Sequence, residues 1–271
     1  MTSIQGQVGN HHDWMRGAAK AGYAARGIVF LIIGFFSFKA AYATGRPMGE
    51  RDALDEIARQ PLGQFVIFVL VAALFAFALW RLAQAVMDID RHGKGAKGLV
   101  IRAGLLASAV TYAALAVYAA SATIGLATGG GGTGGEMVAK AYRAGYGQWI
   151  TYAIALAMAG AGAAHMVKGI RAGFEKYMTI PPERRAWLKP VCQFGLIARG
   201  VTFFILAGLL VTGAESYGGE KAPGLEDVLG TMADWSSGWL LLSLTGLGLM
   251  AFGAYAIAEA HYRRIPVEKI V

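Results

Sequence analysis

Three arginines stand inside apolar stretches of the sequence, where a charge is costly unless it has a partner or a task. Arg26 lies in "ARGIVFLIIGFF" and Arg199 in "ARGVTFFILAGL", while Arg102 follows Gly98 by the same four residues that separate Arg199 from Gly195. A charge at the centre of a membrane-spanning helix costs roughly 2.5–3.5 kcal/mol, and much less near a helix end. Such arginines are either interfacial anchors or an inward-facing set that binds an anion or carboxylates.

A second polar set recurs at one position of three aligned segments. The segments open with "LGQF", "YGQW" and "SGWL", and their aligned glycines are Gly63, Gly147 and Gly238. Twenty-one residues after these glycines stand Gln84, Lys168 and Glu259. At about 1.5 Å per residue this is about 32 Å of helix, which brings the set to the level of the arginines. We therefore expect a cytoplasmic-side polar cluster that is an anion site, a gate closed by a Glu259 ion pair, or a purely structural network.

A third set is acidic and lies toward the opposite end of these helices. Asp52, Glu136 and Asp227 each precede the aligned glycine by eleven residues and stand at the start of a short amphipathic segment. An acid there satisfies free N–H groups and complements the helix dipole. Helix capping is the favoured interpretation of this trio, and a cation-attracting outer mouth is the alternative.

The elements that position these residues are predicted to be membrane-spanning helices. The chain of 271 residues is 56% hydrophobic and only 15% charged, and its mean hydropathy is +0.47. About 20 apolar residues span a bilayer as a helix. Six stretches of at least that length are expected to do so, at about 22–44, 63–87, 99–126, 147–171, 192–214 and 238–262.

The basic residues predict how these helices are oriented. Of the 25 Lys and Arg residues, eighteen fall on the side that holds both termini and the 88–98 and 172–191 loops, whereas ten of the seventeen acidic residues fall on the other side. This asymmetry obeys the positive-inside rule, so both termini are expected to be cytoplasmic. The net charge of +8 is thereby explained without nucleic acid, and contact with anionic lipid headgroups is its expected secondary role.

The alignment also predicts the domain organisation and the fold class. Three parallel repeats of two helices each predict an all-α bundle of six transmembrane helices with pseudo-threefold symmetry. The expected units are a cytoplasmic tail over 1–20, repeats over 21–98, 99–191 and 192–264, and a cytoplasmic tail over 265–271.

Residues suited to catalysis or metal binding are sparse. Cys192 is the sole cysteine and stands in no catalytic motif, and His165 and His261 lack a second ligand at a convincing spacing. We therefore expect no cofactor, no metal and no enzymatic activity. A further set is expected to form an aromatic belt at the membrane interfaces, namely Trp80, Trp149, Trp235, Trp239 and Tyr255.

The motifs resemble a known family. "GYAARG" at Gly22, "GLIARG" at Gly195, "QPLG" at Gln60 and "LWRLAQA" at Leu79 are similar to those of the bacterial inner-membrane proteins grouped as domain-of-unknown-function family 1206. The middle repeat departs most from this pattern, with "GLVIRAG" at Gly98. The resemblance implies the fold and a location in the bacterial inner membrane, but no activity.

Two functions remain open at this point. One is a transporter or channel-like protein for a small, more plausibly anionic, solute, in which the arginines face a wet cavity. The other is a non-catalytic membrane scaffold or lipid- or partner-binding protein with a dry axis. The sequence leaves the oligomeric state open.

Overall fold

The computed structural model describes residues 2–42, 50–59, 61, 63–123, 146–213 and 225–265. These residues form helices and connecting turns, and the described part holds no β-strand beyond one isolated bridge between Met178 and Arg263. The long helices are α1 (Thr2–Ala40), α3 (Gly63–Met87), α4 (Ala96–Thr123), α6 (Gly147–Ile170), α7 (Pro182–Gly213) and α9 (Gly238–Tyr262). The short ones are α2 (Glu50–Arg59), α8 (Leu225–Ala233) and a 3-10 turn, η1 (Glu175–Tyr177).

Each of the six long helices contains a segment that is long and apolar enough to cross a membrane. These segments have 24 to 31 residues, and the shortest, Gly147–Ile170, would still be about 36 Å long. This exceeds the hydrocarbon thickness of about 30 Å. The predicted all-α fold with six membrane-spanning helices is confirmed, and the chain is a multi-pass membrane protein.

Two helices begin earlier than expected. α1 starts at Thr2 and runs without a break through the predicted polar tail, while α7 starts at Pro182, inside the predicted 172–191 loop. Proline suits the first turn of a helix because its missing N–H would have no intrahelical partner there. Pro190 lies further inside α7, at the cost of one backbone hydrogen bond. Hydropathy located the apolar part of each helix and missed these polar extensions.

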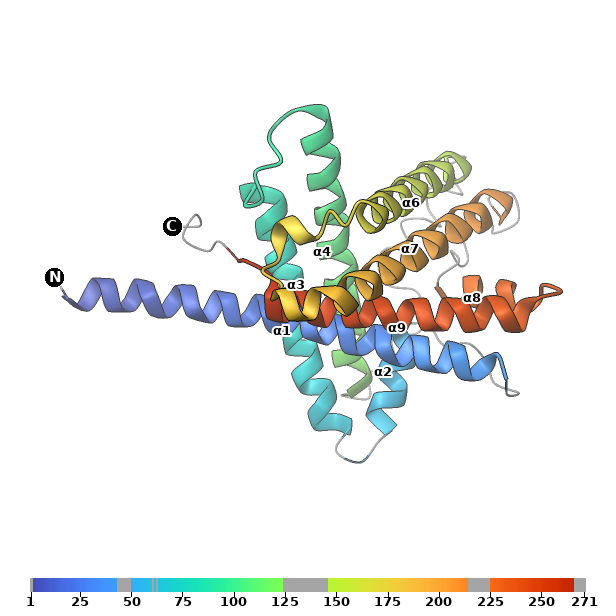
Figure 1. The fold of residues 1–271 in the computed structure, drawn as a ribbon, viewed down its shortest axis with the longest axis horizontal. Coiled ribbons are helices and arrows are strands. Elements are labelled where there is room, and N and C mark those ends of the chain that lie inside the picture. Colours follow the sequence, from blue (N-terminus) through green and yellow to red (C-terminus); the bar gives the residue numbers. More distant parts are fainter. Residues whose placement is uncertain are drawn as a thin grey trace.

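The long helices pack chiefly as three pairs: α1 with α9, α6 with α7, and α3 with α4. α7 also packs on α9 and α1 on α3, whereas α4 and α6 make almost no contact over their described residues. Figure 1 shows α1, α7 and α9 running along the molecule, with α3 and α4 steeply across them. The α3–α4 pair therefore joins the other helices mainly through α1.

Glycines set the close approach at two of these helix pairs. A Cβ atom added to Gly27 of α1 would lie 2.8 Å from the carbonyl oxygen of Gly253 on α9, and one added to Gly253 would lie 2.7 Å from the Gly27 oxygen. Gly162 of α6 and Gly200 of α7 make the same reciprocal contact, at 2.9 and 2.8 Å. Helices in lipid associate through close packing rather than a hydrophobic force, so these contacts hold the two pairs together.

The two glycine pairs occupy equivalent positions of the predicted repeats. Gly162 and Gly253 each stand fifteen residues after the aligned glycine that opens their helix, while Gly27 and Gly200 each directly follow a repeated arginine. The equivalent positions of α3 and α4 hold Ala78 and Ala103. Small residues thus recur at all three pairs.

Packing inside the predicted repeats is shared by the first and third only. Gly22 of α1 lies directly against Phe77 of α3, and Gly195 of α7 lies directly against Phe252 of α9. Phe77 and Phe252 again hold equivalent positions. In the middle repeat, Gly98 lies instead against the loop that precedes α4. The threefold arrangement of the whole bundle, with its unit boundaries, stays a prediction.

Candidate functional site

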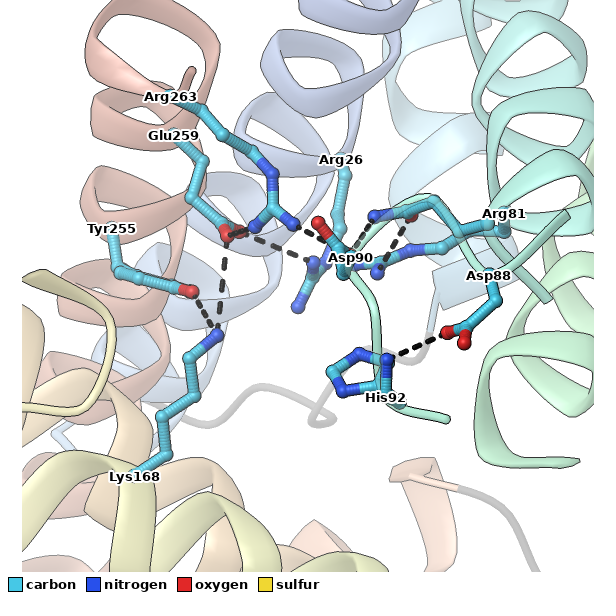
Figure 2. A network of polar contacts seen from close by, with 10 residues as sticks. Arg26, Arg81, Asp88, Asp90, His92, Lys168, Tyr255, Glu259 and Arg263 are labelled. Carbon is cyan, nitrogen blue, oxygen red and sulfur yellow. Dashed lines mark hydrogen bonds and ion pairs between the residues drawn. The ribbon is translucent and has the colours of Figure 1, made fainter. Parts of the chain in front are cut away.

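Charged and polar side chains from four long helices meet near the last turns of α3, α6 and α9, beside α1 (Figure 2). We call this set the charge cluster, and its members are Arg26, Arg81, Gln84, Asp90, Lys168, Tyr255, Glu259 and Arg263. The cluster unites four of the six predicted cytoplasmic-side residues, two of them from helices at opposite ends of the sequence. Their aligned positions in the predicted repeats, rather than proximity in the sequence, led to the expectation that they lie close together.

Glu259 is the centre of the cluster and is only 2% exposed. Its Oε1 atom accepts a hydrogen bond from Nη1 of Arg263 at 2.7 Å and lies 4.0 Å from Nζ of Lys168. Its Oε2 atom lies 3.8 Å from Nη1 of Arg26. Arg263 is therefore the close partner, and two further cations are held at longer range. The spacing of four residues from Tyr255 to Glu259 and on to Arg263 places all three on one side of α9 and its end.

Gln84 links helix α3 to the loop that follows it. This side chain is fully buried; its amide nitrogen donates to Oδ2 of Asp90 at 2.6 Å, and its amide oxygen accepts from Nη1 of Arg81 at 3.3 Å. The same Asp90 oxygen lies 3.3 Å from Nη2 of Arg263. Since buried polar groups need partners, this chain of contacts fixes the α3 end against α9.

Lys168 and Arg26 approach the central carboxylate from different surroundings. Nζ of Lys168 donates to the Tyr255 hydroxyl at 2.6 Å, and its side chain is 33% exposed. The guanidinium of Arg26 is buried and stacks over the rings of Phe252 and Phe77, with its central carbon 4.6 and 5.8 Å from their centroids. A desolvated cation–π contact contributes about 2 kcal/mol. Lys168 is therefore the accessible cation of the pair and Arg26 the enclosed one.

The cluster carries more positive than negative charge. Four cationic side chains, those of Arg26, Arg81, Lys168 and Arg263, face the two carboxylates of Asp90 and Glu259, which leaves a net charge of +2. Arg26, Arg263 and Glu259 are buried and the other three charged groups are partly buried, where an uncompensated charge is expensive. The cluster is therefore suited electrostatically to an additional anion.

Hydrogen-bond donors in and beside the cluster lack partners as well. The Nε atoms of Arg26 and Arg81 are buried without a hydrogen-bond acceptor among the described residues. The same holds for the hydroxyl of Tyr23, a fully buried residue of α1. The Tyr23 ring lies 5.5 Å from the guanidinium carbon of Arg81 and 5.3 Å from that of Arg263. Oε2 of Glu259 is a buried acceptor without a hydrogen bond in the same cluster, so unpartnered donors outnumber unpartnered acceptors. This excess of donors favours an acceptor ligand, which agrees with the sign of the net charge.

Two connecting segments cover the cluster at the end of the bundle. In the loop after α3, the carboxylate of Asp88 accepts hydrogen bonds from the backbone N–H groups of His92 at 2.7 Å and Gly93 at 2.8 Å. Partial burial would raise the pKa of Asp88, but these N–H groups lower it below its ordinary value. The residues after α9 pair with the other segment, since Thr179 N donates to the Tyr262 carbonyl at 2.9 Å.

Arg102 and Arg199, the other two repeated arginines, make contacts of their own. Arg102 donates from Nε to the Ala85 carbonyl at 2.6 Å and from Nη2 to the Val86 carbonyl at 2.9 Å, so it caps the end of α3. Arg199 stacks on aromatic rings, 4.5 Å from Phe30 and 5.7 Å from the Phe252 ring that Arg26 also covers. The three arginines therefore form no common ring: Arg26 joins the cluster, Arg199 borders it and Arg102 lies apart.

The acidic trio falls at two short helices and one stretch outside the described residues. Asp52 and Asp227 each hold the third position of their helix, α2 and α8, so both stand in the first turn, where a negative charge complements the dipole. Nothing is described of their side chains. Glu136 lies within 124–145, outside the described residues.

The expected aromatic belt divides into exposed and buried members. Trp149, Trp235 and Trp239 are 72%, 49% and 56% exposed, as side chains facing a membrane interface would be. Trp80 and Tyr255 are buried, and the expectation for them was wrong. Tyr255 faces inward because it lies one turn before Glu259 on α9, and its hydroxyl accepts a hydrogen bond from Nζ of Lys168.

Sequence reasoning also missed Arg81, Asp90 and Arg263. A signal existed for two of them, since Arg81 precedes Gln84 by three residues and Arg263 follows Glu259 by four, which places each on its partner's helix face. Asp90 lies in a loop whose path periodicity does not predict. Among the described residues, no three His, Cys, Asp or Glu side chains gather as metal ligands.

Comparison with known proteins bears on the two best-matched repeats. The family described as Domain of Unknown Function (DUF1206) matches residues 21–88 and 194–263, which together make up half of the chain. The chain belongs to this family. The matched stretches cover most of the first and third predicted repeats of this DUF1206 protein, which share the packing of Gly22 and Gly195. They contain every member of the charge cluster except Lys168 and Asp90.

One curated relative is similar over nearly its whole length. It is an "Uncharacterized protein YxxB" of Bacillus subtilis (strain 168), which is 29% identical over 261 residues and 94% of each chain. No solved structure matches the chain. These comparisons place the DUF1206 protein in a family without assigning an activity to it.

Proposed function

We propose that this protein is a transporter or channel-like membrane protein that binds a small anion at the charge cluster. The observation that carries the proposal is the excess of positive charge and of unpartnered donors in a largely buried site. A buried site of this kind gains free energy when an anion supplies the missing negative charge and acceptor atoms.

Lys168 is proposed as the point where the anion enters. Its side chain is 33% exposed, while Glu259 beside it is 2% exposed. In Figure 2, Lys168 reaches the central carboxylate from below, whereas Arg81 and Asp90 lie to the right of it. A cation that links solvent to buried cations would draw an anion inward along a gradient of decreasing exposure.

Flux through proteoliposomes tests the proposal. Vesicles that contain the wild-type protein should take up labelled sulfate, chloride or phosphate faster than empty vesicles. Lys168→Met should lower that uptake at least about tenfold, since a charge-assisted contact is worth about 1.5–3 kcal/mol. The matched control is Lys94→Met, which removes an exposed lysine of the loop after α3. Wild-type protein that neither binds nor moves any of these anions contradicts the proposal.

A membrane scaffold is the second candidate, and the packing of the arginines favours it. Arg26 and Arg199 share the Phe252 ring, and the glycine contacts bring α1 and α9 together without a channel between them. In that case the cluster is a set of ion pairs that crosslinks α1, α3, α6 and α9. The same flux measurement separates the two functions, because a scaffold would retain its fold and show no uptake.

The location and lipid contacts are part of the proposal. The protein would reside in the bacterial inner (plasma) membrane with both termini in the cytoplasm. Arg16 near the start of the first span donates to the Ile265 carbonyl at 3.4 Å, so the start of this span lies beside the last described residue, as the proposed orientation requires. The first turns of α7 expose Arg184, Arg185 and Trp187 there. Basic and aromatic side chains in that combination suit anionic lipid headgroups.

A further inference from the structure

We propose that Glu259 is a built-in competitor of the anion, so that anion binding at the charge cluster is coupled to uptake of one proton by this carboxyl group. The inference rests on the proposed function, because it concerns the same site. The coupling ion is a proton, and Glu259 is the residue that carries it.

The geometry places the carboxylate where an incoming anion would have to bind. Glu259 lies 4.0 Å from Nζ of Lys168 and 3.8 Å from Nη1 of Arg26, on opposite oxygens. These are the entry cation and the enclosed cation, so an anion that contacted both would stand in the position of the carboxylate. Neither distance is that of a hydrogen bond, which typically spans 2.7–3.2 Å. Both cations are thus held loosely by Glu259 and are available to a ligand with better geometry.

Protonation of Glu259 leaves two of its cationic partners, Arg263 and Lys168, with other contacts. Its close partner is Arg263, at 2.7 Å, and Arg263 also contacts Asp90 at 3.3 Å. When Glu259 takes up a proton, Arg263 keeps the Asp90 carboxylate as a partner. Lys168 keeps its 2.6 Å contact with the Tyr255 hydroxyl. The cluster therefore stays connected in both protonation states of Glu259.

The proton changes the charge that an anion meets. With Glu259 ionised, four cations face two carboxylates, and with Glu259 neutral they face Asp90 alone, so the net charge rises from +2 to +3. An anion binds more tightly to the protonated cluster. By linkage, the bound anion favours protonation by the same factor.

Other charged and titratable groups interact with Glu259 itself or with its cationic partners. They are Tyr23 and Arg26 on α1, Arg81 on α3, Asp90 in the following loop, His165 and Lys168 on α6, Cys192 on α7, and Tyr255 and Arg263 on its own side. His165 bonds the Ala161 carbonyl of its own helix through Nδ1 at 2.9 Å and packs on Phe203. Asp90 is the second carboxylate, and its bond from Gln84 at 2.6 Å ties it to α3. Glu259 is the carboxylate that both Lys168 and Arg26 approach.

Calorimetric titration of the full-length protein with sodium sulfate tests the coupling. Sulfate is a suitable probe because it does not itself titrate between about pH 5 and 8, the range in which histidine and perturbed groups do. Titrations in buffers of different ionisation enthalpy give the number of protons taken up per sulfate. Wild-type protein in nanodiscs of neutral lipid should take up close to one proton, and its affinity should fall by about tenfold for each rise of one pH unit.

Two variants assign the proton to its group. Glu259→Gln should bind sulfate at every pH with no proton uptake, whereas Glu175→Gln, a carboxylate paired with Arg185 outside the cluster, should behave as the wild type. Sulfate binding by the wild-type protein without proton uptake overturns the inference and leaves the proposed function standing. This result is obtained with the wild-type protein alone, so it does not depend on whether a variant folds. Absence of sulfate binding in the wild type overturns both.

A further arm identifies the source of the anion. The same titration in nanodiscs that contain phosphatidylglycerol shows whether a lipid phosphate occupies the cluster. If the bound anion is a lipid headgroup, phosphatidylglycerol will weaken sulfate binding and reduce its proton uptake. Unchanged sulfate binding there identifies a free anion as the ligand. Either source leaves the coupling to Glu259 in place.

Discussion

The repeated arginines show how one residue type takes three different roles at equivalent positions. Arg26 is enclosed by aromatic rings beside Glu259, Arg199 stacks on Phe30 and Phe203, and Arg102 caps the end of α3. The difference follows from the surroundings: phenylalanines meet the first two, whereas free carbonyls meet Arg102. The three arginines therefore make different contacts although they hold equivalent positions in the predicted repeats.

Substitution of Arg102 should lower stability without changing anion binding. Arg102→Ala removes hydrogen bonds of 2.6 and 2.9 Å to the Ala85 and Val86 carbonyls, a loss of about 1–3 kcal/mol of unfolding free energy. Arg102→Lys should recover part of it, because an ammonium cannot reproduce the two-pronged geometry. Unfolding in mixed micelles measures the first effect and sulfate titration the second. Weakened sulfate binding at unchanged stability would place Arg102 in the anion site instead.

At the scale of helices, close contacts between backbones stabilise the association of the helix pairs, as hydrophobic burial does in a soluble protein. Gly27→Ala should destabilise the α1–α9 pair, because the new methyl group would lie 2.7–2.8 Å from Ile257 and the Gly253 carbonyl. Overpacking of this kind costs about 1–3 kcal/mol. Gly208→Ala on α7 is the control, since a Cβ there meets nothing within 4 Å. Equal thermal midpoints for the two variants in detergent would refute the role given to Gly27.

The loop after α6 is held to the start of α7 by a carboxylate that should make it sensitive to acid. Glu175 accepts two hydrogen bonds from Arg185, at 2.8 and 3.0 Å, and lies 3.6 Å from Nζ of Lys189. The bonds from Arg185 lower the pKa of Glu175 from its ordinary value of 4.5, against the opposing effect of burial. A lowered pKa means that the stabilisation is fully present above pH 4.5 and is lost as the pH falls through the lowered value.

Hydrogen exchange of residues 172–181 checks this expectation. After correction for the intrinsic rate, protection should be constant above pH 4.5 and decline below it, by a modest amount because surface pairs contribute about 0–1 kcal/mol. Glu175→Gln should show the lower protection at every pH. A variant whose protection still follows the wild-type profile would assign the acid sensitivity to another group.

At the same scale, the sequence predicted the depth of residues along the helices better than the side of the helix on which they lie. The aligned register placed Gln84, Lys168 and Glu259 in one network because equivalent helices carry equivalent positions to equivalent depths. Hydropathy cannot tell which side of an apolar helix faces a neighbour, so Tyr255 was assigned to the membrane interface instead of the cluster. The loop that brings Asp90 to Arg263 has no periodicity, and nothing in its composition predicts that contact.

Considered as a whole, the molecule departs from the predicted threefold symmetry at the predicted middle repeat. The first and third repeats retain the glycine–phenylalanine packing of Gly22 on Phe77 and Gly195 on Phe252, and the family match covers these two. The predicted middle repeat lacks that packing over its described residues, and its helices α4 and α6 pack on α3 and α7 instead of on each other. It nevertheless supplies Lys168, a partly exposed cation of the cluster. The repeat that diverged most in packing thus contributes the residue through which the proposed ligand enters.

Orientation in the membrane is the property of the whole molecule that most needs a direct measurement. In a Cys192→Ala background, single cysteines at Lys94 and Lys176 should react with a membrane-impermeant thiol reagent from the cytoplasmic side, and cysteines at Tyr146 and Ser236 from the opposite side. All four residues are exposed, and each lies in or beside a segment that joins two spans. This pattern follows from six crossings with both termini inside. Because α3 and α4 run steeply across α1 and α9 (Figure 1), the Lys94 position is the sharpest test. If it is labelled from the side opposite to Lys176, the α3–α4 pair does not cross the bilayer in the predicted sense, and the threefold arrangement must be abandoned.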